Sequence, residues 1–341
     1  CSAGTQLMSV ENDPFVRVHD LSIDIPVANG ILHAVRDVSF EIQKGQTLCI
    51  VGESGSGKSM LALGIIGLLP HRATRVASEI SFGGVDLQNL SRSELSMIRG
   101  RRVAMIFQEP MTSLNPCYTI GDQMIEMAVR HLKMAVTDAQ DCARMWLEKV
   151  GIPASSERLK QYPHQLSGGL RQRVMIAMML MCEPELIIAD EPTTALDVTI
   201  QAQVLHVLSS LQHELGLTML FITHDLGVVS RIADQIAVMY AGSFVEIGSA
   251  QAVLDTPQHP YTRGLLDCIP GFSTRSRDGK LGTISGAVPS LIGVASGCAF
   301  SNRCPNAVAE CTQGQNPEPR VVGNQYVRCL MPKSSLILAD H

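Results

Sequence analysis

The sequence contains no apolar run long enough to cross a membrane. The densest run, residues 174–182, is nine residues long, whereas a membrane-spanning helix needs about 20. Positive charge is also scarce: the sequence has 27 Lys and Arg residues and 32 Asp and Glu residues, which gives a net charge of −5. This balance argues against a protein that binds nucleic acid by broad electrostatic attraction. Residues 1–13 hold neither a basic start nor an apolar block, so no secretory signal peptide is predicted.

Charged residues make up only 17% of the 341 residues, while hydrophobic residues make up 45%, which is enough for a large buried core. This length suggests two domains, or one large domain with an appendage. The ten cysteines are unusual. Six are scattered among apolar or loop residues, and four lie close together near the C-terminus: Cys298, Cys304, Cys311 and Cys329. Disulfides are not expected in a cytosolic chain of this size, so the cluster indicates another role.

Short β-rich runs alternate with helical stretches over most of the chain. Runs 15–25 and 35–42 alternate apolar and polar residues, as strands with one buried face do. Continuous apolar runs predict buried strands at 47–51, 103–107, 186–189, 219–223 and 236–239. The alternation predicts an α/β fold with a largely parallel sheet.

The pattern becomes helical between residues 116 and 165. Segments 120–134 and 138–150 predict two helices, with Thr137 as the N-cap of the second. We therefore predict a helical insertion in the α/β domain. Beyond about residue 248 the sequence is rich in Pro, Gly and Ser, and 271–282 predicts a linker before the cysteine cluster.

Residues 52–59, GESGSGKS, match the phosphate-binding P-loop pattern in full. The loop follows a predicted strand and precedes an apolar helix expected at 60–69, which is the context that the motif requires. Its glycines let backbone N–H groups turn inward around an anion. Lys58 is expected on the β- and γ-phosphates of a nucleotide, and Ser59 on Mg²⁺. The predicted nucleotide-binding residues of the loop are Gly52, Ser54, Gly55, Ser56, Gly57, Lys58 and Ser59.

Two carboxylates end the apolar strand expected at 186–189. Asp190 is expected to hold Mg²⁺, and Glu191 is placed to polarise an attacking water. Because the carboxyl ends of parallel strands face the ligand crevice, both side chains are expected near the P-loop. A chance acidic pair at a strand end is the plainer alternative, and the complete P-loop argues against it.

Further motifs resemble those of the ATP-binding cassette (ABC) ATPases, in the order found in that family. Leu166-Ser167-Gly168-Gly169 resembles the signature motif, and Gln108 resembles the Q-loop glutamine. Ala195-Leu196-Asp197 resembles the D-loop, and His224 the switch histidine. This resemblance runs from about residue 15 to 250 and implies a P-loop ABC ATPase fold with a helical subdomain.

Two segments narrow the resemblance to ATP-binding subunits of dipeptide and oligopeptide importers. Residues 108–116, QEPMTSLNP, and 258–262, QHPYT, are similar to segments of that subfamily. Its relatives include ATPases of nickel and glutathione importers, which remain alternatives, as does a non-transport ABC ATPase. The implied domains are an ABC ATPase domain at 15–248, its helical subdomain at about 109–168 and a C-terminal extension at 249–341. Residues 1–14 are expected to be an N-terminal leader or added residues. Met8 is a candidate natural start, and the residues before it are then either added or part of an upstream extension.

The family implies a site shared between two ATPase subunits that meet head to tail. Ser167, Gly168 and Gly169 of one subunit then contact the ATP that the P-loop of the other binds with Mg²⁺. Glu191 orients water, His224 contacts the γ-phosphate, and Gln108 approaches Mg²⁺. The implied partners are a second and distinct ATPase, two transmembrane permease subunits and an extracytoplasmic solute-binding protein, but no nucleic acid. The implied location is the cytoplasmic face of the inner membrane, by peripheral association.

The family usually places an aromatic residue after the first strand to stack on adenine. Ile25 is the expected equivalent here, although it offers no π face, and His33 is a possible substitute.

Four thiols in the C-terminal tail suit a 4Fe-4S cluster or a structural zinc. The spacing Cys298-x5-Cys304-x6-Cys311-x17-Cys329 lacks the close Cys pairs of most zinc sites, which favours the cluster. The importer resemblance points the same way. Buried thiols without a ligand are the plainer alternative. We expect the group to staple the extension rather than to transfer electrons.

Overall fold

The structure is a computed structural model that describes residues 13–108, 113–194, 196–269, 282–293 and 297–330. Its main sheet has eight strands, in the order β12-β13-β11-β10-β3-β9-β8-β7. Strands β10 to β7 pair in parallel, whereas β11, β13 and β12 extend one edge antiparallel. The α/β expectation is therefore confirmed. The strands are β3 Thr47–Val51, β7 Val103–Ile106, β8 Leu186–Asp190, β9 Thr218–Thr223, β10 Gln235–Tyr240, β11 Ser243–Ser249, β12 Arg320–Val322 and β13 Gln325–Val327.

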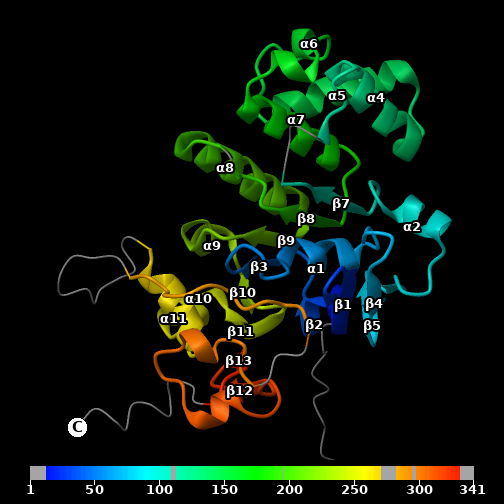
Figure 1. Ribbon diagram of the computed structural model, residues 1–341. Helices are drawn as coiled ribbons and strands as arrows, with labels where there is room; N and C mark the ends of the chain where they lie inside the picture. The colour runs from blue at the N-terminus through cyan, green and yellow to red at the C-terminus, as the bar shows by residue number, and fades with distance from the viewer. Residues whose placement is uncertain (1–12, 109–112, 195, 270–281, 294–296, 331–341) are drawn as a thin grey trace, which may run out of the picture.

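The parallel strands are buried on both faces, because their side chains alternate between two apolar cores. On β3, Leu48 and Ile50 join one core, while Cys49 and Val51 join the other. The first core includes residues of α1 and of the N-terminal strands, and the second includes residues of α7 and α8. Figure 1 labels these helices and strands on the ribbon. The helices around the sheet are α1 Lys58–Ile65, α7 Gly168–Leu180, α8 Val198–Leu215 and α9 Leu226–Ile232. Within the described ranges, none of the helices is both long and apolar enough to cross a membrane.

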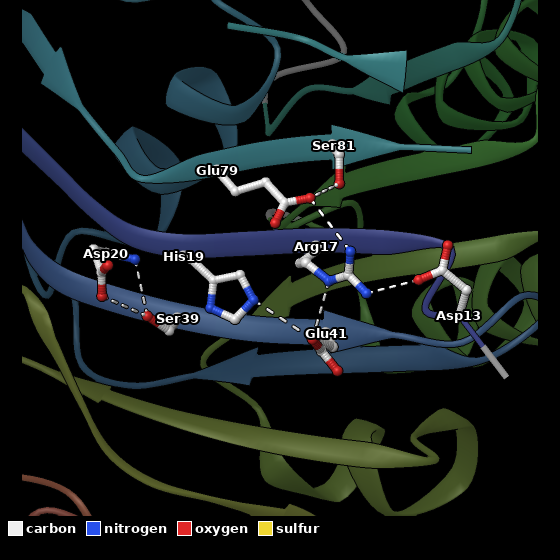
Figure 2. A network of polar contacts seen from close by, with 8 residues as sticks. All are labelled: Asp13, Arg17, His19, Asp20, Ser39, Glu41, Glu79 and Ser81. Carbon is white, nitrogen blue, oxygen red and sulfur yellow. Dashed lines mark hydrogen bonds and ion pairs between the residues drawn. The ribbon is translucent and has the colours of Figure 1, made fainter. Parts of the chain in front are cut away.

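A second, antiparallel sheet follows the order β2-β1-β5-β6, with β4 also paired to β1. One face is buried through alternate residues of β1, such as Val16 and Val18, as the alternation at 15–25 predicts. The other face carries polar contacts around Arg17, which donates to Glu41 at 3.2 Å and to Glu79 at 3.4 Å (Figure 2). The elements here are β1 Val16–Val27, β2 Gly30–Ile42, β4 Thr74–Val76, β5 Glu79–Phe82, β6 Val85–Asp86 and the nearby helix α2 Arg92–Ile98.

The helical insertion forms as expected but differs in two details. Helix α4 (Ile120–Met127) ends well before residue 134, because a π-helical turn follows and stops at Lys133, whose φ of 60° is left-handed. Helix α5 (Val136–Lys149) has Ala135 as its N-cap, so the prediction of Thr137 is wrong. The backbone of Thr137 is already helical and cannot occupy the extended cap position. Shorter pieces complete this region: α6 Ser155–Arg158 and the 3₁₀ turn Pro163–Gln165.

The chain beyond residue 249 packs onto the main sheet. Strand β13 pairs with β11, which places β12 and β13 at the sheet edge. These strands are not predicted by the sequence, because three residues carry too little periodicity to be recognised. Glu246 on β11 is fully buried and accepts backbone hydrogen bonds from Gln258 (2.7 Å) and His259 (2.9 Å). It thereby ties helix α11 to the sheet. The helical pieces are α10 Ala250–Asp255, α11 Pro260–Asp267, and 3₁₀ turns Ser301–Arg303 and Ala309–Thr312.

The predicted linker at 271–282 lies outside the described residues except for its last residue. All four residues 109–112 of the segment similar to peptide importers, and Ala195 of the D-loop, also lie outside the described residues. These expectations stay predictions.

Replacing Trp146 with Ala should lower the free energy of unfolding by about 3–5 kcal/mol, because it removes a large buried ring and leaves a cavity. Trp146 lies on α5 in the core and is 1% exposed. Its neighbour Met145 is 46% exposed, so Met145→Ala is a matched control with an expected change of about 0.5 kcal/mol or less. Urea unfolding followed by circular dichroism checks both. Equal stability of the two variants would contradict the expected packing.

Candidate nucleotide site

The P-loop connects β3 to α1 and is wedged between two other strands. Gly57 caps α1 with a left-handed φ of 105°, and a Cβ there would lie 2.2 Å from the carbonyl oxygen of Ala34 on β2. A Cβ on Gly52 would lie 2.2 Å from the carbonyl oxygen of Met239 on β10. Only glycine fits either position, which is the structural reason for two of the motif's glycines. Helix α1 ends at Ile65 rather than at 69, because Gly67 takes a left-handed φ of 67°.

Lys58 lies at the centre of the loop with its ammonium group buried. The Nζ donates to the carbonyl oxygens of Gly52 (2.9 Å) and Glu53 (3.0 Å), and it lies 3.9 Å from Oε1 of Glu191. Burial lowers the pKa of Lys58, while the surrounding carboxylates oppose that shift. The structure thus brings the P-loop lysine to the end of β8, as expected from the sequence.

Glu191 is the hub of the polar contacts at the carboxyl end of β8. Its Oε2 accepts hydrogen bonds from Nε2 of Gln108 (3.1 Å) and Oγ1 of Thr194 (2.9 Å), and it lies 3.1 Å from Nδ1 of His224. The backbone of Glu191 has a left-handed φ of 45°, a strained conformation that is common at functional sites. The structure therefore brings Gln108, Glu191 and His224 together. Thr194 was not predicted, since a threonine after a strand most often indicates a turn.

Ser59 and Asp190 form the second polar pair of the site. The Ser59 hydroxyl donates to Oδ1 of Asp190 at 3.0 Å. Burial raises the pKa of Asp190, while the Ser59 hydrogen bond and the Lys58 charge act in the opposite direction. A hydroxyl and a carboxylate side by side at the start of α1 form an oxygen donor set of the kind that Mg²⁺ prefers.

Lys58, Ser59 and Glu191 line one cavity of about 940 Å³. One part of its wall is the P-loop, with Gln108, Glu191 and His224 beside it. The apolar part of the wall consists of Leu32, Ala34, Met60, Leu265, Val288, Pro289 and Leu291. Neither Ile25 nor His33, the two predicted adenine contacts, lines this cavity. His33 instead pairs through Nδ1 with Asp24 at 2.7 Å.

The signature residues lie away from this cavity, at the start of α7. Ser167 is the N-cap, and its Oγ accepts a hydrogen bond from the backbone N–H of Leu170 at 3.4 Å. Gly168 and Gly169 form the first turn of the helix. A Cβ on Gly169 would lie 2.6 Å from Ile200 of α8, so this glycine also permits close helix packing. None of these three residues lines the cavity formed by the P-loop of the same chain.

The C-terminal extension contacts the P-loop directly, which the sequence analysis did not predict. Nη1 of Arg303 donates to both carboxylate oxygens of Glu53, at 3.0 and 3.1 Å. The backbone N–H of Glu53 donates to the hydroxyl of Tyr261 at 3.0 Å. The carbonyl of Glu53 accepts a hydrogen bond from Lys58. Side-chain exposure is 5% for Arg303 and 30% for Glu53, so this ion pair is largely shielded from water. No motif marks an ion pair formed between residues 250 positions apart.

The four clustered cysteines line one small cavity in the extension. Cys298, Cys304, Cys311 and Cys329 share its wall with the buried ring of His259. The backbone N–H of Cys298 donates to the carbonyl of Cys311 at 2.8 Å, which joins two of the four loops. Burial raises the pKa of the Cys298 and Cys304 thiols. Over the described ranges, no three His, Cys, Asp or Glu side chains are grouped so that they could hold a metal ion.

Comparison with known proteins identifies two regions of the chain. Residues 35–194 match the family described as ABC transporter, and 245–311 match oligopeptide/dipeptide transporter, C-terminal region. The dipeptide transport ATP-binding protein DppD of Bacillus subtilis is 49% identical over 86% of this chain and 88% of its own length. The oligopeptide transport ATP-binding protein OppD of Salmonella typhimurium is 45% identical over 94% of this chain and 95% of its own length.

A similar fold has been solved as a dimer. The ATP-binding cassette MJ0796, bound to ADP and Pi in a post-hydrolysis state, matches with a TM-score of 0.62 and 26% identity. The match covers 69% of this chain and 98% of that one. Sequence identity to DppD and OppD extends through the cassette and the region that follows it. The chain therefore belongs to the ABC transporter ATPases, in the group that carries the oligopeptide/dipeptide transporter C-terminal region.

Proposed function

We propose that this chain is the ATP-hydrolysing subunit of an importer for dipeptides or oligopeptides. The observation that carries hydrolysis is the position of Glu191, which contacts Gln108, Thr194 and His224 and lies beside Lys58. The peptide assignment rests on the similar DppD and OppD proteins, which are named for dipeptide and oligopeptide transport. Import of nickel, glutathione or another small solute is the alternative, and a non-transport ABC ATPase is a more distant one.

The proposed roles follow from the geometry. Backbone N–H groups of the P-loop hold the phosphates, and Lys58 leaves its carbonyl partners to reach the β- and γ-phosphates. Ser59 and Asp190 would hold Mg²⁺, with Gln108 approaching from the end of β7, and the bound ion would neutralise phosphate charge. Glu191 orients the attacking water and accepts its proton, while His224 contacts the γ-phosphate. Ser54, Gly55 and Ser56 complete the proposed phosphate cradle with Gly52 and Gly57.

A second ATPase subunit completes the proposed site. Ser167, Gly168 and Gly169 present a hydroxyl and backbone N–H groups at the N-terminus of a 13-residue helix, which favours a phosphate. Since they lie outside the cavity of their own chain, we assign them to the nucleotide bound by a partner, in a dimer like that of MJ0796. The partner is proposed to be a distinct paralogue.

The proposed complex also contains two transmembrane permease subunits and an extracytoplasmic solute-binding protein, and no nucleic acid. The chain associates peripherally with the cytoplasmic face of the inner membrane. Purification of the complex from native membranes, followed by mass spectrometry, identifies these partners. A solute-binding protein specific for nickel or glutathione would favour the alternative solutes, and recovery without any permease would contradict transport.

We further propose a 4Fe-4S cluster in the cysteine-lined cavity, with zinc as the alternative. Support comes from four thiols on one wall and from the sulfur ligands that such clusters take. A cluster is wider than a single ion, so its ligands need not converge on one point. Bound there, it would join the loops of Cys298, Cys304, Cys311 and Cys329 and stabilise the extension.

Changing Glu191 to Gln should leave ATP binding within about twofold and lower the rate of hydrolysis by roughly 10²–10⁴-fold, because the amide cannot accept the proton of water. Phosphate release by the assembled transporter, with ATP binding measured separately, checks both parts. Glu214→Gln is the control, since Glu214 pairs with Lys149 on the surface at 2.8 Å. Hydrolysis that survives Glu191→Gln at the rate of the control would remove Glu191 from catalysis.

Changing Arg303 to Ala should weaken ATP binding about 3- to 10-fold, because it releases the Glu53 carboxylate and loosens the P-loop. Glu53→Gln should have a similar effect, and the double variant should be no weaker than the worse single variant. Arg17→Ala, on the outer face of β1, is the matched control. Additive losses in the double variant would show that Arg303 acts on binding by another route.

Anaerobic purification should give a brown protein with a broad visible absorption band and about four iron and four sulfide per chain. Cys311→Ser should lower all three and reduce thermal stability, whereas Cys117→Ser, at an exposed position, should change none of them. A colourless protein with one zinc per chain would replace the iron assignment with the zinc alternative.

A further inference from the structure

We propose that the C-terminal extension builds the wall of the nucleotide site against which the base of ATP packs. This inference rests on the proposed binding of the phosphates at the P-loop. The residues concerned are Val288, Pro289 and Leu291, together with Leu265 of α11 and Leu32 of β2. No catalytic step is assigned to them, because they position the nucleotide.

The segment 282–293 reaches the cavity by pairing with β2. The backbone N–H of His33 donates to the carbonyl of Leu291 at 2.9 Å, and that of Gly293 donates to the carbonyl of Ile31 at 3.1 Å. Leu32 and Ile292 form an antiparallel bridge between the two segments. The extension therefore forms an isolated antiparallel bridge with the part of β2 that passes next to Gly57 of the P-loop.

This pairing turns Leu291 toward the cavity and Ile292 away from it. Successive residues of an extended segment point to opposite sides. Leu291 lines the cavity, whereas the adjacent Ile292 does not line it and is 41% exposed. Val288 and Pro289 continue the same wall, and Leu265 adds a side chain from α11. Four of the seven apolar side chains on the cavity wall thus come from the extension.

The polar and the apolar residues line different parts of the cavity, and this separation indicates where the base lies. The phosphates belong at the P-loop, beside Lys58 and Ser59, so the base must lie elsewhere in the same cavity. Transfer of a flat aromatic ring from water is most favourable when the ring packs against an apolar wall. The two positions expected from the family pattern, Ile25 and His33, do not line this cavity. Much of the apolar contact that a stacking aromatic makes elsewhere is supplied here by Val288, Pro289 and Leu291, which lie more than 250 positions further along the chain.

The test compares the binding of ATP and of inorganic triphosphate to the full-length protein, both with Mg²⁺. The double variant Val288→Ala/Leu291→Ala removes methyl and methylene groups from the wall but keeps the backbone pairing. We expect its ATP affinity to fall roughly tenfold and its triphosphate affinity to stay within about twofold. Ile292→Ala is the matched control, because it lies in the same segment and outside the cavity, and it should change neither affinity.

The outcomes separate this inference from the function on which it rests. ATP affinity in the double variant equal to that of Ile292→Ala would overturn the base wall, as would an equal loss for both ligands. Lys58→Ala should weaken both ligands. If it weakens neither, the placement of the phosphates at the P-loop is wrong, whatever the double variant does.

A second measurement uses the unaltered protein and so does not depend on a variant that folds. Photolabelling with 8-azidoadenosine triphosphate, followed by peptide mass spectrometry, locates the base. We expect label in the peptide that contains residues 284–291 or at Leu32. Label confined to Ile25 and His33, and suppressed by excess ATP, would place the base on the other side of β2 and overturn the proposal.

Discussion

The nucleotide site depends on the close fit of the P-loop backbone between two strands from different sheets. Gly52 lies against the carbonyl of Met239 on β10, and Gly57 lies against that of Ala34 on β2. At both places there is no room for a side chain. The loop therefore fixes the N-terminal sheet and the central sheet relative to each other, and the positions of Lys58 and Ser59 follow from that fit. The rest of the site is arranged around this loop.

The other polar groups of the nucleotide site lie at the carboxyl ends of three strands. Gln108 follows β7, Glu191 follows β8 and His224 follows β9, and these strands are neighbours in the sheet. Parallel pairing brings residues far apart in sequence to one edge, where Glu191 contacts both of the others. A strained backbone at Glu191 is tolerated because these contacts and Thr194 hold it from several sides.

The C-terminal extension is part of the same unit. Its strand β13 continues the main sheet, buried Glu246 ties α11 to that sheet, and Tyr261 and Arg303 both contact Glu53 of the P-loop. Arg303 is also the sequence neighbour of Cys304, which lines the cysteine cavity. The extension therefore contacts the phosphate-binding loop through residues on α11 and beside the cysteine cluster.

Particular residues show how far the sequence could predict the site. The P-loop, Asp190 and Glu191 were recognisable because local chemistry requires those residue types at fixed spacing. Thr137 failed as an N-cap because the helix already begins at Val136, with Ala135 in the cap position, and helix boundaries are the least reliable part of such predictions. The strands β12 and β13 were too short to show a period. Ile25 and His33 were chosen by local analogy, whereas the cavity wall is completed by a distant segment.

The sequence by itself determined the class of fold, the phosphate loop and the identity of the polar groups around it. These are encoded in short segments, where the spacing of glycines, apolar runs and carboxylates is compatible with few local structures. Only the tertiary structure decided which groups meet: the contact of Arg303 with Glu53, the convergence on Glu191 and the apolar wall at Leu291. Each of these contacts joins segments far apart in the chain. They form only when the sheets and the extension pack together, so no local sequence pattern predicts them.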